Sequence, residues 1–261
     1  AHFAWSCAPW VCPCASMTVS IARSIPKMLS GSSMTQSYLW YEDRNNMASS
    51  VITTNPARCR DCYRCVRTCS VKAIRVQDGQ AQVVPELCIT CGDCVRACPQ
   101  GAKTVRDDRP EIVQALREGR KVVASVAPSA PAYFGMHVFS QIEDALHGLG
   151  FAAADETAFG AEMVGQAHRE FVEGSQEAWP VITSSCPVVV NLIEKYHPDL
   201  ISHLAPIVSP MIAHGRFMRE KYGADAYVVF IGPCIAKKGE IKDLPVAGVV
   251  DAALTDRKSV V

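Results

Sequence analysis

The chain has 261 residues, of which 49% are apolar and 20% charged, a balance that suits a folded core and excludes a disordered chain. Lys plus Arg and Asp plus Glu both number 26, so the net charge of zero excludes a general polyanion-binding surface. No apolar run reaches the ~18–20 residues of a membrane span, and no P-loop or GxGxxG motif is present, so we expect no binding to membranes or nucleic acids. Cysteine is the exception. The chain has 13 cysteines, an odd number, and most of them lie close together in the sequence. This indicates metal chemistry in a reducing, cytoplasmic compartment rather than disulfides.

The start of the chain, residues 1–50, shows no helical or strand periodicity. Cys7, Cys12 and Cys14 lie here without the spacing of a metal site, and Met47 fits the start of a native chain. We expect residues 1–50 to be unstructured or not native coding sequence, with an unusual metal-binding arm as the alternative. A signal peptide is not expected, because no apolar core precedes a small-residue cleavage site.

Eight cysteines form two runs with the same spacing, C-x2-C-x2-C-x3-C, so that the second run repeats the first at a constant offset. Thiolates suit the iron of a 4Fe–4S cluster, and in this arrangement the fourth cysteine of each run binds the other cluster. The first cluster is therefore expected on Cys59, Cys62, Cys65 and Cys98, and the second on Cys88, Cys91, Cys94 and Cys69. Zinc sites and disulfides are the alternatives, but zinc ribbons place two C-x2-C pairs further apart.

Between the two runs, residues 74–83 alternate in polarity around Asp78-Gly79 and predict a β-hairpin. Pro99 follows the second run as expected for this spacing, whereas Ser70 takes the corresponding place in the first. Residues 51–107 resemble a bacterial two-cluster ferredoxin, which implies an α+β electron-transfer domain with a redox partner protein. Because the fourth cysteines cross over, we expect both halves to fold as one unit around the metals.

Residues 108–261 change to an alternating α/β pattern. Helices are predicted from 110 to 118, over about 142–149 and over 188–196, and buried strands over 121–126 and 226–231. This order predicts an α/β domain with a largely parallel sheet. Cys186 and Cys234 each follow a short apolar segment, and the ends of such strands are where this kind of fold binds ligands.

The residues around these two cysteines resemble motifs of a known family. Residues 183–187 (TSSCP) and 233–240 (PCIAKKGE) are similar to the first two signatures of the large subunit of iron–iron (FeFe) hydrogenases, TSCCP and MPCxxKKxE. VAPSAPAYFG, ALHGLGF, FGAE and IEKYHPDLI agree, so the resemblance covers residues 110–255. It implies that Cys186 and Cys234 are two of the four ligands of the H-cluster, a 4Fe–4S cluster joined to a two-iron unit with CO and cyanide. It also implies dihydrogen and protons as substrates, and Lys237 as a cationic donor to a cyanide, with a solvated surface lysine as the alternative.

Several residues depart from the family pattern. Ser185 stands where the family has its proton-transfer cysteine, and an alcohol is far less acidic than a thiol with a pKa near 8.5. Gly232 replaces a methionine beside the two-iron unit, so we expect a different wall there, which a methionine would refill. The relay carboxylates of the family align with His168 and Phe171, and Phe171 cannot carry a proton. These departures resemble the sensory branch, which reports dihydrogen to a signalling domain.

The third family motif, which supplies the other two cluster cysteines, is absent, because no cysteine follows Cys234. We therefore expect the hydrogenase-like α/β domain to be incomplete. Residues 256–261 resemble one reading frame of a sequencing adapter. The H-cluster is then expected only in a full-length parent, and the fragment is expected to be inactive.

Three functions stay open. The first is a dihydrogen-sensing or slow hydrogenase whose parent carries a downstream signalling domain. The second is a truncated catalytic hydrogenase that uses ferredoxin as its electron partner. The third is a plain 4Fe–4S electron-transfer module. Ser185, Gly232 and Phe171 favour the first over the second, and the missing third motif makes the third the most literal description of these residues.

Overall fold

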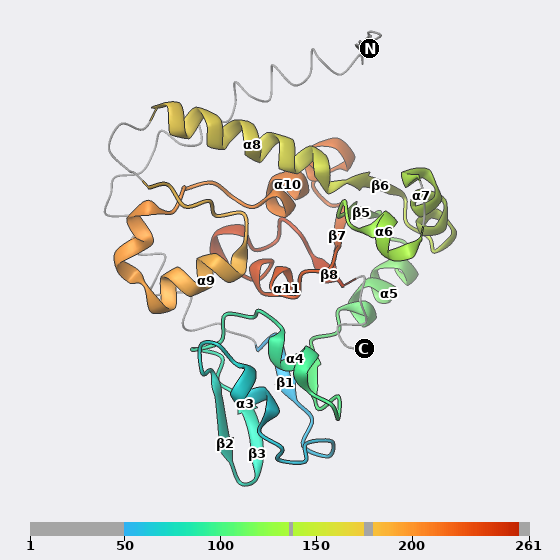
Figure 1. Ribbon diagram of the computed structural model, residues 1–261. Coiled ribbons are helices and arrows are strands. Elements are labelled where there is room, and N and C mark those ends of the chain that lie inside the picture. Colours follow the sequence, from blue (N-terminus) through green and yellow to red (C-terminus); the bar gives the residue numbers. More distant parts are fainter. Residues whose placement is uncertain (1–49, 136–137, 175–179, 256–261) are drawn as a thin grey trace, which may run out of the picture. The chain divides into compact units, whose positions relative to one another are not determined.

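The structure covers the larger part of the chain. The computed structural model describes residues 50–135, 138–174 and 180–255 (Figure 1), and these fall within one compact unit, Tyr41–Val261. The predictions for residues 1–49, with Cys7, Cys12 and Cys14, and for residues 256–261 lie outside the described part.

An internal repeat organises the N-terminal segment, residues 50–106. Helices α3 (Arg64–Thr68) and α4 (Asp93–Ala97) occupy equivalent places in the two cysteine runs.

Two antiparallel strand pairs complete this segment. Strand β1 (Ile52–Thr54) pairs with β4 (Lys103–Val105), and β2 (Ile74–Gln77) pairs with β3 (Gln80–Val83). The second pair is the predicted hairpin, since Gln77 pairs with Gln80 across Asp78 and Gly79. Both turn residues have positive φ, 51° and 70°, as a two-residue type I′ turn requires.

A four-stranded parallel sheet forms the centre of the C-terminal segment, residues 107–255. Its order is β6-β5-β7-β8, with β5 (Val122–Val126) and β7 (Tyr227–Ile231) in the middle. Both central strands were predicted from their continuous apolar runs, which is the pattern of strands buried on both faces. The edge strands β6 (Ala153–Glu156) and β8 (Ala252–Leu254) are short and give no such signal.

Helices surround this sheet. They are α5 (Arg109–Arg117), α6 (Ala130–Phe134), α7 (Phe139–Gly148), α8 (Thr157–Gly174), α9 (Pro187–Tyr196), α10 (Pro210–Tyr222) and α11 (Lys237–Glu240), with 3₁₀ turns at Pro198–His203 and Leu244–Val246. The predicted helices correspond to α5, α7 and α9. In the described part of the chain, no helix is long and apolar enough to cross a membrane.

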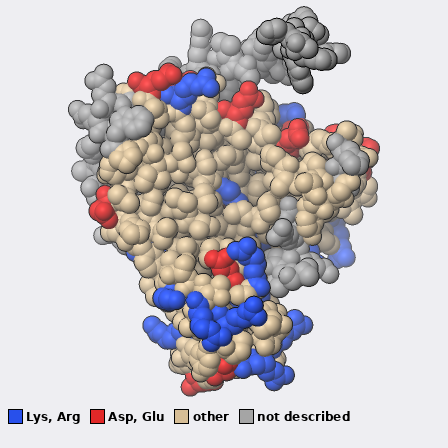
Figure 2. All heavy atoms as spheres, viewed as in Figure 1, with Lys and Arg blue, Asp and Glu red and all other residues tan. Residues whose placement is uncertain are grey.

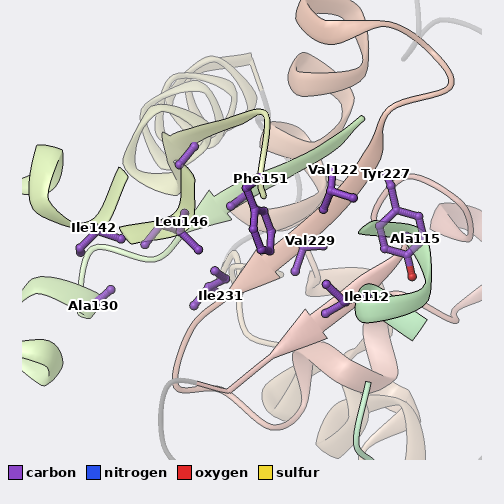
Figure 3. Close-up of a cluster of buried hydrophobic side chains, with 14 residues drawn as sticks. Ile112, Ala115, Val122, Ala130, Ile142, Leu146, Phe151, Tyr227, Val229 and Ile231 are labelled. Carbon is purple, nitrogen blue, oxygen red and sulfur yellow. The ribbon is translucent and has the colours of Figure 1, made fainter. Parts of the chain in front are cut away.

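Alternate residues of the central strands face two separate cores. On one face, Val122 and Val229 pack with Ile112 of α5 and Leu146 of α7 (Figure 3). On the other face, Val123 and other side chains of the two central strands pack with Met211, Ile212 and Met218 of α10, and α10 also packs against α8. The sheet is therefore covered on both sides, as expected for a parallel α/β architecture.

Candidate functional site

Four thiols from both cysteine runs line one cavity. Cys69, the last cysteine of the first run, lies there with Cys88, Cys91 and Cys94 of the second. The rest of the wall is mainly apolar and includes Ile52, Val71, Ala73, Ile74, Val83 and Ile89. The structure thus brings together the four residues that the spacing assigns to the second cluster. In the described residues, no group of three or more Cys, His, Asp or Glu side chains is arranged to hold a single metal ion. Four thiols around an apolar cavity are the donor type that a 4Fe–4S cluster takes.

The remaining thiols form a second group. The electrostatic neighbours of the Cys65 thiol include Cys59 and Cys98, and burial raises the pKa of Cys65. The Oε1 atom of Gln100 accepts weak S–H hydrogen bonds from Cys62, at 3.6 Å, and from Cys98, at 4.0 Å. Cys98 therefore lies near thiols of the first run. Cys62 is the exposed member of this group.

Backbone N–H groups point at the fourth sulfur of each run. Ala73 N donates to Cys69 Sγ at 3.2 Å, and at the equivalent place in the second run Ala102 N donates to Cys98 Sγ, also at 3.2 Å. Burial opposes ionisation of Cys98, but the surrounding N–H groups and Lys103 outweigh it and lower the pKa of this thiol. Such hydrogen bonds favour thiolates, the form in which cysteine binds iron.

The loops between the cysteines need left-handed backbone at repeated places. Asp61 and Tyr63 have φ of 52° and 56°, and their counterparts Thr90 and Gly92 have φ of 62° and 83°. Only Gly92 takes this conformation without a steric cost. It also allows a close approach, because a Cβ placed on Gly92 would lie 2.8 Å from Cδ1 of Ile235. Since Ile235 follows Cys234, the second cysteine run lies directly beside the second hydrogenase-type motif.

Lys237 joins the two hydrogenase-type motifs. Its Nζ donates to the carbonyl oxygen of Ser185 at 3.3 Å and forms an ion pair with Glu240 at 2.6 Å. Lys237 is 8% exposed, so it is not a solvated surface lysine. Cys186, at the N-terminus of α9, is exposed, and Cys234, just beyond the end of β7, is half-buried. The two motifs, far apart in sequence, thus meet at Ser185 and Lys237.

The expected wall at Gly232 needs correction. A Cβ at this position would lie 2.6 Å from Cζ of Phe230 and 2.9 Å from Cβ of Ala127. The space beside Gly232 is therefore filled by the ring of Phe230, and a methionine could not enter without displacing it. The two relay positions lie on α8, where Nδ1 of His168 contacts the Val164 carbonyl oxygen at 2.8 Å and Phe171 is half-buried.

A buried ionic network that the sequence did not reveal holds the second motif against the start of the C-terminal segment. Arg106 donates from Nε to Asp108 at 2.8 Å and from a guanidinium nitrogen to the Lys238 carbonyl oxygen. Asp108 also accepts from Ala253 N at 3.1 Å and faces Lys238 Nζ at 3.4 Å. Burial opposes ionisation of Asp108, but Arg106 and Lys238 lower its pKa. The carboxylate is therefore charged, and it fixes the residue next to Lys237.

The C-terminal end of helix α9 contacts the second cysteine run. Nζ of Lys195 donates to the carbonyl oxygens of Cys88, at 2.7 Å, and Pro85, at 3.1 Å. The hydroxyl of Tyr196 donates to those of Leu87, at 2.7 Å, and Val71, at 3.2 Å. Cys186 occupies the N-cap position at the start of the same helix. One helix thus connects the first hydrogenase-type motif with the loops around the four-thiol cavity.

A buried polar cluster between β5, α8 and α10 was also not predicted from the sequence. Nδ1 of His214, on α10, lies 2.7 Å from Oγ of Ser125, which lies 2.8 Å from Oγ1 of Thr157. His214 has no exposed surface, and burial lowers its pKa to about 4. Gly160 of α8 packs against it, since a Cβ there would lie 2.6 Å from Cβ of His214. The cluster joins β5, α8 and α10.

Comparison with known proteins decides the family. A family model described as the iron only hydrogenase large subunit, C-terminal domain, matches residues 120–259, more than half of the chain. The chain belongs to this hydrogenase family. A second model, described as a 4Fe-4S dicluster domain, matches residues 37–103. Iron–sulfur cofactors are therefore implied for both segments of this hydrogenase-family chain.

Three curated relatives illustrate the family. The periplasmic [Fe] hydrogenase large subunit of Nitratidesulfovibrio vulgaris is 35% identical over 238 residues, which cover 79% of this chain and 56% of the relative. Iron hydrogenase 1 of Clostridium pasteurianum is 31% identical, over 46% of this chain and 24% of its own length. The cytosolic Fe-S cluster assembly factor nar1 of Emericella nidulans is 29% identical, over 47% of this chain and 26% of its own. The chain thus spans between about a quarter and just over half of these relatives.

Proposed function

We propose that this chain is an iron–sulfur electron-transfer protein that passes electrons between two 4Fe–4S clusters and a hydrogenase-type site. The contact between Gly92 and Ile235 carries this proposal, because it sets a loop of the second cysteine run against the residue that follows Cys234. Electrons that reach the cluster of this run would then have a short path to the second motif. The family membership supports such a transfer.

The proposed ligand sets follow the crossed grouping of the thiols. Cys59, Cys62, Cys65 and Cys98 would hold the first cluster, and Cys69, Cys88, Cys91 and Cys94 the second. Each cluster supplies one-electron redox chemistry when bound. The chain keeps the second set in an apolar cavity and directs N–H groups at the fourth sulfur of each set, and both features influence cluster potential.

For the hydrogenase-type site, Cys186 and Cys234 are the proposed ligands in this chain. They are two of the four cysteines that an H-cluster needs. Lys237 is the proposed donor to an anionic ligand. Its Nζ is held by Glu240 and by the Ser185 carbonyl oxygen, which fixes a cation between the two motifs.

Ser185 favours slow turnover or sensing of dihydrogen in a protein that completes the site. A serine hydroxyl is a far weaker acid than the family's thiol, so proton exchange at this position would be slow. A sensor of this kind would pass its redox state to a downstream signalling domain. A fast, ferredoxin-dependent hydrogenase is the competing proposal and predicts that Ser185→Cys changes little.

A plain 4Fe–4S electron-transfer module is the second candidate. The exposure of Cys186 favours it. In this case Lys237 would serve only to join the two motifs through Ser185 and Glu240. One relative of this chain is named as a cytosolic Fe-S cluster assembly factor, which agrees with a role in iron–sulfur chemistry other than hydrogen turnover.

The redox partner that we propose is an acidic protein. Residues 50–106 contain nine Lys and Arg but four Asp and Glu, although the whole chain is neutral, and basic side chains gather over this segment in Figure 2. Four exposed arginines, Arg58, Arg60, Arg64 and Arg67, accompany the exposed Cys62. An acidic partner would be steered to the first cluster by this charge. We propose a cytoplasmic location, where the cysteines stay reduced.

Metal analysis of the full chain tests the proposal. After anaerobic reconstitution, iron and acid-labile sulfide should each amount to about eight per chain, because two sets of four cysteines each hold a cubane. Electron paramagnetic resonance of the reduced protein should show two interacting clusters. A stable content of about four irons, or of zinc without sulfide, would refute the two-cluster assignment.

A further inference from the structure

The N-terminal segment has a buried lysine at its centre. Lys103, on β4, is 1% exposed. Its Nζ donates to Oγ1 of Thr54 at 2.6 Å and to the carbonyl oxygen of Ala81. Both partners are neutral, and among the described residues no carboxylate lies within ion-pairing distance of this ammonium. A buried charge without a counter-ion is costly, so its presence requires a source of negative charge.

The repeat shows that the fold itself does not need a lysine here. The position equivalent to Lys103 in the first half of the repeat is Ile74, on β2, which is also buried and belongs to the apolar core of the segment. The two positions follow equivalent cysteines, Cys98 and Cys69, and follow equivalent alanines, Ala102 and Ala73. An apolar residue satisfies one half of the repeat, so the cation in the other half has a separate cause.

The thiols of both groups lie within the electrostatic reach of Lys103. Ala81, whose carbonyl oxygen accepts from Lys103 Nζ, packs in one buried cluster with Cys65 and Cys94. The residue before Lys103, Ala102, donates its N–H to Cys98 Sγ at 3.2 Å, and the Lys103 cation acts on all three thiols. Cys94 belongs to the proposed second cluster, whereas Cys65 and Cys98 belong to the first. Lys103 is therefore positioned to act on both.

We propose that Lys103 is a fixed buried cation that compensates the negative charge of both clusters and raises both reduction potentials. The inference rests on the proposed two-cluster function. Reduction adds an electron to a cluster, and a nearby positive charge stabilises that added charge in a poorly screened interior. Because Lys103 has neutral partners, its field is not cancelled locally. Both clusters should respond in the same direction, which local packing changes would not produce.

The test compares Lys103→Met with Lys72→Met in the reconstituted full chain. Lys72 is an exposed lysine shortly after Cys69, so the same substitution there removes a solvent-screened charge. Midpoint potentials are measured anaerobically by titration followed by electron paramagnetic resonance. For Lys103→Met, both midpoints should become more negative by at least about 59 mV, which corresponds to a tenfold change in the oxidised-to-reduced ratio for one electron. Lys72→Met should shift them much less.

Iron content separates the possible failures. If the wild-type chain binds no clusters, the proposed function itself fails. If Lys103→Met binds full iron and its midpoints equal those of the wild type, or only one midpoint moves, the inference about Lys103 is overturned. If Lys103→Met does not load, loading by Lys103→Arg but not by Lys103→Ile supports a requirement for the charge, and failure of all three variants contradicts it.

Discussion

Gly92 and Ile235 meet where the second cysteine run faces the second hydrogenase-type motif, and a Cβ on Gly92 would lie 2.8 Å from Cδ1 of Ile235. The contact depends on a residue with no side chain at a left-handed position, φ 83°. It also determines how closely the loop that carries Cys91 approaches the residue after Cys234. Small changes at this point therefore report on the connection between the two sites.

We expect Gly92→Ala to destabilise the protein through both the backbone strain and the contact with Ile235. The strain costs about 1 kcal/mol at a left-handed position, and crowding adds about 1 kcal/mol more. At this chain length the thermal midpoint falls by ~2–4 °C per kcal/mol. Thermal unfolding of the reconstituted chain under anaerobic conditions measures the loss.

Gly79→Ala is the matched control for this prediction. Gly79 also has positive φ, 70°, but nothing lies within 4 Å of the position of its Cβ. It should therefore show only the strain. Adding Ile235→Ala should recover part of the loss in Gly92→Ala and none of that in Gly79→Ala. Equal losses in both glycine variants would contradict the contact.

Lys195→Met should weaken the attachment of α9 to the second cysteine run. The substitution leaves the carbonyl oxygens of Cys88 and Pro85 without this donor, at a cost of about 1–3 kcal/mol. We expect faster amide hydrogen exchange in residues 85–88 and 187–196, with little change in the sheet. The exposed Lys242 provides the control variant, Lys242→Met. Unchanged exchange in Lys195→Met would show that α9 is held by other contacts.

The cysteine pattern allowed much of the N-terminal segment to be predicted. The offset between the two runs recurs in the helices and in the N–H donors to Cys69 and Cys98, because identical spacing around each cluster imposes identical local backbone. The hairpin at Asp78-Gly79 followed from its turn residues. The central strands followed from apolar runs. These are local signals, and local chemistry determines the structures that they predict.

The contacts between segments could not be predicted in the same way. Nothing local distinguishes the buried Lys103 and Lys238, or the half-buried Lys195, from surface lysines, because their partners are distant in sequence. Gly232 was misread for the same reason, since the ring that occupies its space belongs to Phe230 and is placed by the sheet. His214 lies on a helix that no periodicity in the sequence had indicated. Tertiary packing alone reveals these roles.

Gly232→Met should therefore destabilise the protein rather than repair a wall. The larger side chain must displace Phe230 and Ala127, and overpacking of this kind costs about 1–3 kcal/mol. Gly148→Met is the control, since nothing lies within 4 Å of the position of its Cβ. Thermal unfolding of both variants decides the matter. A thermal midpoint for Gly232→Met at or above that of the wild type would show that the ring of Phe230 moves aside readily.

The buried His214 should make stability depend on pH. Its pKa is about 4 in the folded protein against about 6.5 when unfolded, so between these values the unfolded chain binds more protons. Stability is complete above pH ~6.5 and is lost as the pH falls toward 4, by up to about 3 kcal/mol. His214→Gln should be less stable at pH 7, because packing around Ser125 changes, but its stability should fall less between pH 6.5 and 4.5. Parallel slopes for both proteins would contradict a neutral buried His214.

The crossed ligand assignment is tested most directly by matched cysteine variants of the reconstituted full chain. Cys62→Ala and Cys91→Ala each remove a ligand whose cluster is not in dispute, and they provide reference spectra for loss of the first and second cluster. Iron content and electron paramagnetic resonance are then compared for Cys69→Ala and Cys98→Ala. We predict that Cys69→Ala reproduces the Cys91→Ala spectrum and that Cys98→Ala reproduces the Cys62→Ala spectrum. The reverse pairing would show that each run binds its own cluster, and it would contradict the account.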